Sequence, residues 1–171
     1  MKLYLDRVPS PIGAILLVSD GEALRALDFE DYEPRMQRLL RNYCGRYDLT
    51  QGVRSGARQH IAGYFDGDLT ALDTIPVQTG GTEFQRRVWA ALRQIPPGST
   101  TSYGRLAAKI GAPKASRAVG LANGANPVAI VVPCHRVIGA DSSLTGYGGG
   151  LPRKAWLLRH EANACAGRSA A

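Results

Sequence analysis

Residues 82–123, TEFQRRVWAALRQIPPGSTTSYGRLAAKIGAPKASRAVGLAN, decide the fold of the second half of the chain. Thr82, followed by Gln85 three residues later, forms a capping box that predicts the start of a helix. Apolar residues then recur near one face of this helix, from Phe84 to Leu92. A Pro-Pro-Gly run at 96–98 ends it. We therefore expect the apolar face of this helix in the protein core.

Two shorter helices are predicted after the Pro-Pro-Gly run. The first covers about residues 102–110 and stops at Gly111, and the second covers about residues 114–123. Helix, glycine-containing turn and helix together outline a helix-turn-helix, a motif that binds DNA. Two helices of an ordinary bundle give the same pattern, so the pattern alone leaves both interpretations open. The second helix carries mostly small side chains, which let a helix approach a duplex closely: Ala115, Ser116, Ala118, Gly120 and Ala122.

The charge of the chain is divided unevenly between its halves. Residues 1–79 hold nine Lys and Arg against eleven Asp and Glu, a net charge of −2. Residues 80–171 hold twelve against three, a net charge of +9. So strong a basic excess attracts polyanions, although a solvated basic face is the plainer explanation. We favour a phosphate backbone as the partner, with binding that weakens as salt rises.

The first half has the pattern of a small antiparallel sheet. Short apolar runs at 3–5, 15–18 and 24–29 are separated by turn-forming residues. Helices are predicted over 34–43 and 56–65, and residues 73–81 resemble an extended linker. The fold class predicted is therefore α/β (α+β). An N-terminal domain occupies residues 1–79, and a mainly helical domain occupies residues 80–171.

Membrane, secretory and zinc-binding classes lack support in the sequence. The longest clean apolar runs span five residues, whereas a transmembrane helix needs about 20. Met1–Ser10 has no apolar stretch typical of a signal peptide. The three cysteines are widely spaced and form no zinc or disulfide pattern. We expect a cytoplasmic protein with reduced thiols, no metal and no membrane partner.

One cysteine has the surroundings of a nucleophile. Residues 131–137 read VVPCHRV, so His135 and Arg136 directly follow Cys134. Nearby positive charge and hydrogen bonding favour the thiolate, which is the reactive form. Neighbouring side chains of a regular strand point to opposite faces. His135 can therefore act as a base for Cys134 only if the backbone turns after Pro133 or a water bridges the two. Cys44 and Cys165 are expected to be small buried hydrophobic residues.

Taken together, the motifs of the second half closely resemble the O6-alkylguanine-DNA alkyltransferase family. The resemblance covers roughly Gly80 to Glu161 in matching order and spacing. The N-terminal half is more loosely similar to bacterial members, in the stretches Ser10–Gly13 and Tyr64–Gly67. The residues that carry the main resemblance are Arg117-Ala118-Val119-Gly120, Asn126-Pro127, Pro133-Cys134-His135-Arg136-Val137, Gly146-Tyr147-Gly148-Gly149 and Lys154 through Trp156-Leu157-Leu158 to Glu161.

This resemblance implies a set of catalytic roles. Cys134 is implied as the alkyl acceptor and His135 as the group that takes its proton through a water, with Glu161 orienting His135. Asn126 is implied to tie the DNA-reading helix to the Cys134 turn. Tyr103 is implied to help rotate the nucleotide and to hydrogen-bond the departing guanine. From pattern alone, Glu161 would be a surface acid, Asn126 a turn former and Tyr103 a packing residue.

The resemblance also implies a DNA-binding surface and a base pocket. Arg117 is implied to enter the base stack after the nucleotide is flipped out, since a stacked base lies beyond the reach of a thiolate. A phosphate contact or a solvent-exposed position is the alternative for Arg117. Lys154 either orients the loop formed by residues 146–149, called here the Tyr147 loop, or contacts solvent, and we favour solvent. The other DNA-binding residues implied are Ala115, Ser116, Gly120, Asn123 and Arg136, and the pocket residues are Tyr147, Gly148, Gly149, Val132 and Pro133.

The function implied is direct, irreversible repair of O6-alkylguanine, and of O4-alkylthymine, in double-stranded DNA. A thioether on Cys134 is not cleaved by water at neutral pH, so each chain would act once. The resemblance implies a ribonuclease-H-like N-terminal fold, a monomer and no cofactor. Some family members hold zinc in the N-terminal domain, but only Cys44 and His60 are present there.

Two other functions need to be distinguished from repair. A non-transferring DNA sensor related to the alkyltransferases would lack the acceptor cysteine, which is present here. A cysteine hydrolase using Cys134 and His135 would leave the helix-turn-helix and the basic charge unexplained.

Overall fold

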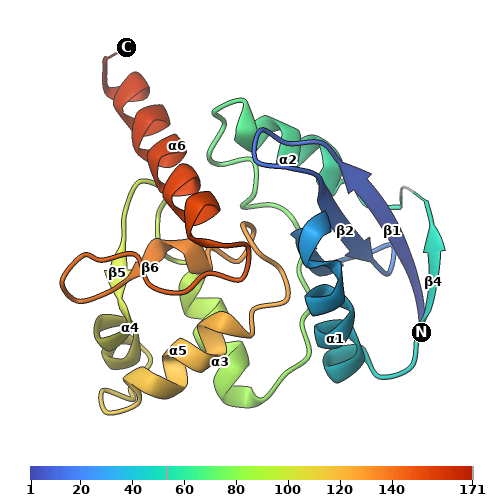
Figure 1. Ribbon diagram of the computed structural model, residues 1–171, viewed down its shortest axis with the longest axis horizontal. Helices are drawn as coiled ribbons and strands as arrows, with labels where there is room; N and C mark the ends of the chain where they lie inside the picture. Colours follow the sequence, from blue (N-terminus) through green and yellow to red (C-terminus); the bar gives the residue numbers. More distant parts are fainter. Residues whose placement is uncertain (53, 171) are drawn as a thin grey trace. The chain divides into compact units, whose positions relative to one another are not determined.

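A computed structural model describes residues 1–52 and 54–170 (Figure 1). The chain divides into two compact units. Unit 1 comprises Met1–Gly81 and Pro127–Val131, and unit 2 comprises Thr82–Asn126 and Val132–Ala171. The sequence had placed the whole of residues 80–171 in one domain. The short segment Pro127–Val131 departs from that expectation, because it belongs with the N-terminal residues.

Unit 1 is built on a four-stranded sheet in the order β3-β2-β1-β4. Strands β1 (Lys2–Val8), β2 (Ile15–Ser19) and β3 (Leu24–Phe29) form the predicted antiparallel meander. The fourth strand, β4 (Asp48–Gln51), pairs parallel to β1 and was not predicted. Its sequence, DLTQ, contains a single large apolar residue, so it has no alternating pattern from which a strand could be inferred.

Two helices complete the N-terminal part of unit 1. A short 3-10 turn, η1 (Glu30–Tyr32), leads into α1 (Glu33–Cys44), and α2 (Ala57–Phe65) follows β4. Met36 and Leu40 of α1 lie at the i and i+4 positions and join one buried cluster with apolar residues of the sheet. The residues that the three antiparallel strands contribute to this cluster are Leu3, Leu5, Leu16, Val18 and Ala26.

The outer edge of β3 is paired rather than left open. Leu24 exchanges backbone hydrogen bonds with Pro76 and Gln78, and Leu27 exchanges them with Pro127 and Ala129. Part of the expected 73–81 linker therefore extends the sheet. An unpaired strand edge is a template for aggregation. Covering this edge is the structural role of both segments.

Unit 2 is mainly helical, as predicted. Its helices are α3 (Glu83–Leu92), α4 (Tyr103–Lys109), α5 (Ser116–Gly124) and α6 (Leu151–Ala170). The expected capping box is formed, because Thr82 and Gln85 each accept a hydrogen bond from the other's backbone N–H. Trp89 of α3 donates its indole N–H to the carbonyl of Ala122, which fixes α3 against α5. No helix in the described part of the chain is long and apolar enough to span a bilayer.

A two-stranded parallel ladder connects distant parts of unit 2. Strand β5 (Thr101–Ser102) directly precedes α4 and pairs with β6 (Val137–Ile138), which directly follows the short 3-10 helix η2 (Cys134–Arg136). The start of α4 is thereby held beside the VVPCHRV stretch. Dipeptide strands carry no periodicity, so the sequence did not predict this pairing.

Shortening Leu40 to alanine should destabilise unit 1. Leu40 is 1% exposed within the cluster shared by α1 and the sheet. Leu40→Ala should lower the free energy of unfolding by about 2–4 kcal/mol, through lost burial and the cavity left behind. Urea titration followed by circular dichroism measures this. Arg41→Ala, at the neighbouring exposed position, is the control. An equal loss of free energy of unfolding in both variants would contradict the position of Leu40 in the core.

Candidate functional site

The backbone turns sharply at the candidate nucleophile. Pro133, at φ −81° and ψ 65°, lets the Cys134 N–H donate to the carbonyl of Val132 at 2.8 Å. Residues Cys134–Arg136 then form η2, closed by the Arg136 N–H to Pro133 carbonyl bond of 3.0 Å. In a 3-10 helix successive side chains lie about 120° apart, because three residues complete a turn. This is the turn that His135 needs in order not to face away from Cys134.

Two asparagines fasten this turn to α5. Asn126 donates its side-chain amide to the carbonyl of Val132 at 2.8 Å, and Asn123 donates to the carbonyl of Cys134 at 3.4 Å. Both side chains are buried. Asn123 was expected on the DNA-contacting surface, and this expectation was wrong. Its amide faces inward because a carbonyl of the Cys134 turn needs a donor.

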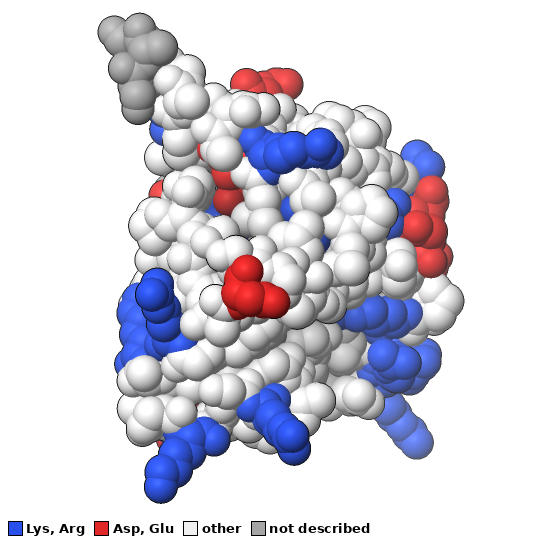
Figure 2. All heavy atoms as spheres, turned by 60° about the vertical axis from the view of Figure 1, so that its left-hand side comes forward, with Lys and Arg blue, Asp and Glu red and all other residues white. Residues whose placement is uncertain are grey.

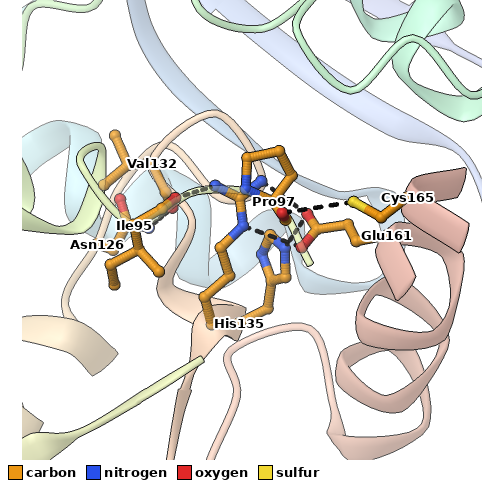
Figure 3. A network of polar contacts seen from close by, with 8 residues as sticks. Ile95, Pro97, Asn126, Val132, His135, Glu161 and Cys165 are labelled. Carbon is orange, nitrogen blue, oxygen red and sulfur yellow. Dashed lines mark hydrogen bonds and ion pairs between the residues drawn. The ribbon is translucent and has the colours of Figure 1, made fainter. Parts of the chain in front are cut away.

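A buried carboxylate organises the other side of the turn (Figure 3). Glu161 of α6 is 0% exposed and lies 2.7 Å from Nε2 of His135. Arg136 donates two hydrogen bonds to the same carboxylate, at 2.8 and 3.0 Å, and a third to the carbonyl of Ile95 at 2.6 Å. A buried charge is tolerated when it is paired and hydrogen-bonded in this way.

The ionisation of this cluster follows from its contacts. Burial by itself would raise the pKa of Glu161, but the hydrogen bonds from His135 and Arg136, together with the positive charge of Arg136, outweigh burial and lower that pKa below its usual range. Burial lowers the pKa of His135 and outweighs the opposing effect of Glu161. The group at neutral pH is therefore an ionised carboxylate beside a neutral imidazole.

The tautomer of His135 follows from its partner. A carboxylate can only accept hydrogen bonds, so Nε2 of His135 carries the hydrogen and donates it to Glu161. The lone pair is then on Nδ1, which is buried and hydrogen-bonded to no described residue. This nitrogen is available as a proton acceptor.

Two basic residues have internal roles that the sequence did not reveal. Arg136 was expected to bind DNA, but it is 6% exposed and its guanidinium is engaged by Glu161 and Ile95. Lys154 was expected to contact solvent, but it is 0% exposed. Its ammonium donates to the carbonyls of Val137 and Thr145 at 2.6 Å each and of Gly146 at 3.4 Å. Both corrections have one cause, which is that buried carbonyl and carboxylate oxygens need donors.

The ammonium of Lys154 also interacts with the cysteine. Burial lowers the pKa of Lys154, and the charge of Cys134 acts in the opposite direction. A thiolate at Cys134 is therefore attracted to a fixed positive group of the protein. The same lysine holds the start of the Tyr147 loop through the carbonyls of Thr145 and Gly146.

An open cavity of about 550 Å³ lies between α5 and the Tyr147 loop of unit 2. Tyr147 and Gly148 line it, as expected of pocket residues, whereas Gly149, Val132 and Pro133 are not among the lining residues. Asn123 lines the cavity and also hydrogen-bonds the Cys134 carbonyl, so the cavity adjoins the cysteine turn. The remaining lining residues are Tyr103, Ser116, Arg117, Gly120, Gly124, Gly139, Thr145 and Gly146.

Thr145 is a cavity residue that sequence reasoning missed. Its Oγ1 lies 2.9 Å from the hydroxyl of Tyr103, which places Tyr103 between the start of α4 and the Tyr147 loop. Thr145 belongs to an exposed loop with no periodic pattern, and a Tyr–Thr pair separated by 42 residues leaves no local trace in the sequence. Only its position directly before Gly146-Tyr147 could have pointed to it.

The surface formed by α4 and α5 is basic, and α5 carries small side chains there. Gly120 and Ser116 of α5 line the cavity, Ala115 immediately precedes the helix, and the exposed Arg117 stands at the cavity wall. Figure 2 shows Lys and Arg side chains projecting from the lower part of the visible face, at the height of α4 and α5 in Figure 1. The exposed basic residues that these two helices and their connection contribute are Arg105, Lys109, Lys114 and Arg117.

Among the described residues, no three His, Cys, Asp or Glu side chains are grouped so as to hold a metal ion. Cys44 and Cys165 are half-buried free thiols, and Cys134 is the buried one. Figure 3 shows Cys165 directed toward Pro97, whose carbonyl is 3.5 Å from its sulfur.

The fold and site are those of a DNA-binding protein that carries a buried cysteine, histidine and glutamate. Two family models match the chain: the 6-O-methylguanine DNA methyltransferase ribonuclease-like domain at residues 3–79 and the 6-O-methylguanine DNA methyltransferase DNA-binding domain at residues 83–163. The chain belongs to the 6-O-methylguanine DNA methyltransferase family.

Similar proteins cover nearly the whole chain. A methylated-DNA–protein-cysteine methyltransferase of Salmonella typhimurium is 49% identical over 166 residues, which are 94% of this chain and 96% of the relative. The O6-methylguanine methyltransferase structure of Mycobacterium tuberculosis is 46% identical, with a TM-score of 0.80 over 95% of this chain and 94% of that one. A Mycobacterium tuberculosis structure in complex with DNA is 44% identical, with a TM-score of 0.81 over 96% and 94%.

Removing the Lys154 ammonium should destabilise the protein. Lys154→Met leaves three carbonyl groups without their donor, which should lower the free energy of unfolding by about 2–4 kcal/mol. Urea unfolding monitored by tryptophan fluorescence provides the measurement. Lys109→Met, at an exposed position of α4, is the matched control and should change stability by less than about 0.5 kcal/mol. Equal midpoints for Lys154→Met and the unaltered protein would refute this role.

Proposed function

We propose that this chain repairs DNA by transferring the alkyl group of O6-alkylguanine to the sulfur of its own Cys134. The observation that carries the proposal is the buried Cys134 turn, hydrogen-bonded to Asn123 of the cavity wall and followed by the His135–Glu161 pair. Family membership gives the chemical class. The similar Mycobacterium tuberculosis protein has been solved in complex with DNA, which supports double-stranded DNA as the partner.

The target nucleotide has to leave the duplex before the reaction. The O6 substituent of a stacked guanine is out of reach of a thiolate, and flipping a nucleotide costs a few kcal/mol. In this proposal Arg117 fills the space left in the stack, which its exposure at the cavity wall supports. The cavity between α5 and the Tyr147 loop receives the base. Its glycines, including Gly148, allow backbone to approach a flat ring closely.

The proton relay uses the tautomer that Glu161 imposes. Nδ1 of His135 accepts the proton of the Cys134 thiol through a water, and the resulting imidazolium is stabilised by the ionised Glu161. The thiolate attacks the alkyl carbon, the S–C bond forms and the O6–C bond breaks. The bonding electrons leave with the guanine oxygen, and the proton held by His135 returns through water to the guanine. The Tyr103 hydroxyl hydrogen-bonds the departing base after leaving Thr145.

The product fixes the stoichiometry. A thioether on Cys134 is stable to water, so each chain accepts one alkyl group.

We propose that O4-alkylthymine is a second substrate, because the same kind of bond, between an oxygen attached to the ring and an alkyl carbon, is broken on a smaller ring. We also propose that the protein acts as a monomer. The free thiols suit the reducing cytoplasm. We propose that the catalytic and DNA-binding groups all belong to residues 80–171, and that residues 1–79, joined by Pro127–Val131, form the other domain.

Transfer of label tests this function directly. Excess protein is incubated with duplex DNA carrying O6-[³H-methyl]guanine, and tryptic peptides are counted. One methyl group per chain should appear on the peptide containing Cys134, and Cys134→Ser should accept none, with Cys165→Ser as the matched control. Label that stays on the DNA would indicate a non-transferring sensor. Turnover of a thioester or amide by Cys134 without label transfer would indicate a hydrolase.

The pH dependence of transfer reports the state of His135. Burial lowers the pKa of His135, so its neutral form persists below the usual value of about 6.5. The single-turnover rate should therefore be flat from about pH 8 to 6.5 and fall as the pH drops through the lowered pKa. His135→Gln should transfer about 10²- to 10⁴-fold more slowly and lose this acidic limb. A midpoint above pH 6.5 in the unaltered protein would contradict the neutral imidazole.

A further inference from the structure

Leu121 is the most exposed large hydrophobic side chain in the described part of the chain. It is 77% exposed, compared with 52% for Met1, 44% for Leu151 and 36% for Leu144. It lies within α5 rather than at a terminus or in a loop. An isolated leucine on a surface needs no explanation, so its surroundings decide whether it has a role.

The neighbours of Leu121 on the helix are cavity residues. Arg117 lies four residues before it, Gly120 one before and Gly124 three after, and all three line the cavity. Residues spaced by three or four share a helix face. Leu121 therefore lies on the side of α5 that carries Arg117 and Gly124. Because Ala118, Gly124 and Ala125 are small, the leucine side chain protrudes beyond these neighbours.

The charge around Leu121 limits what can cover it. No Asp or Glu occurs between Glu83 and Asp141, whereas Lys114 and Arg117 are exposed on the same helix or directly before it. An apolar side chain among cations suits a polyanion that also presents apolar surface. DNA has this combination, because deoxyribose carbons and base edges lie between its phosphates.

We propose that Leu121 is a DNA-contacting residue that packs on the deoxyribose and base edge of a nucleotide flanking the one displaced by Arg117. Four residues of an α-helix advance about 6 Å along its axis, and stacked nucleotides of one strand are about 3.4 Å apart. With the axis of α5 running along the strand, Leu121 then lies one or two nucleotides beyond Arg117. Its contact stabilises the opened duplex and adds apolar affinity to the phosphate contacts of the basic residues. This inference rests on the proposed function, in that α5 is taken to face the DNA.

The test compares two exposed leucines of unit 2. A fluorescein-labelled duplex containing one O6-methylguanine is titrated with the unaltered protein and with Leu121→Ala, Leu121→Met and Leu151→Ala, using anisotropy at several salt concentrations. Leu121→Ala should bind about fivefold to twentyfold more weakly, because it loses burial of three side-chain carbons. Leu121→Met should recover most of the affinity, and Leu151→Ala should match the unaltered protein.

Salt dependence separates an apolar contact from a charged one. The slope of log K against log salt counts neutralised phosphates, so Leu121→Ala should keep the unaltered slope, whereas Arg117→Ala should reduce it if Arg117 also neutralises a phosphate. Equal affinities of Leu121→Ala and Leu151→Ala would overturn the proposal. So would a change in self-association of the free protein, measured by sedimentation, that accounted for the whole effect of Leu121→Ala.

The methyl-transfer assay keeps the two proposals distinguishable. If the unaltered protein transfers no methyl group to Cys134, the proposed function fails whatever Leu121 does. If it transfers methyl and Leu121→Ala binds the duplex normally, only the role of Leu121 fails. Because the side chain is largely exposed, thermal unfolding of Leu121→Ala should match that of the unaltered protein, and a lower melting temperature would assign the leucine to packing instead.

Discussion

The buried carboxylate of Glu161 is the constraint on which the arrangement of unit 2 depends. An ionised group without water needs donors on both oxygens, and here His135 and Arg136 supply them. Arg136 in turn reaches the carbonyl of Ile95, so a single charge ties α6, η2 and the turn after α3 together. The same charge selects the tautomer of His135 and opposes the lowering of its pKa by burial. The stability of unit 2 and the proposed reactivity of Cys134 therefore have a common origin, and a change to Glu161 would disturb both.

A second group of side-chain hydrogen bonds connects the helix proposed to bind DNA with the turn at Cys134. Asn123 and Asn126 lie at the end of α5 and directly after it, and their amides hold the backbone on either side of Pro133. Lys154 holds the opposite side of the cavity through carbonyls of the Tyr147 loop. The helix proposed to face DNA, the Cys134 turn and the Tyr147 loop are thus connected by side chains that donate to main-chain carbonyls. Such bonds fix positions without requiring particular residues at the acceptor positions.

The sequence was informative wherever a pattern is local. The capping box at Thr82 and Gln85, the meander of β1 to β3 and the residues around Cys134 were all identified from neighbouring residues. It failed where a side chain is satisfied by a distant backbone group. Arg136 and Lys154 are basic residues in a basic half, and their charge alone suggested DNA or solvent. Lys154 is bound by main-chain carbonyls such as that of Val137, and Arg136 by the Ile95 carbonyl and by Glu161, which lies 25 residues away, so neither set of partners leaves a local mark in the sequence. β4 was missed because four mostly polar residues pair only through β1.

The path of the chain between α5 and Cys134 has a consequence for how the protein unfolds. After Asn126 the chain leaves unit 2, adds Pro127–Val131 to unit 1 and returns at Val132, whose carbonyl is bound by Asn126. Within this buried apolar segment, Pro127 and Ala129 therefore depend on Leu27 of the N-terminal sheet for backbone hydrogen bonds. A fragment consisting of residues 82–171 would lose these bonds close to Cys134. The two units are interleaved in the sequence, and we expect them to lose structure as one cooperative transition.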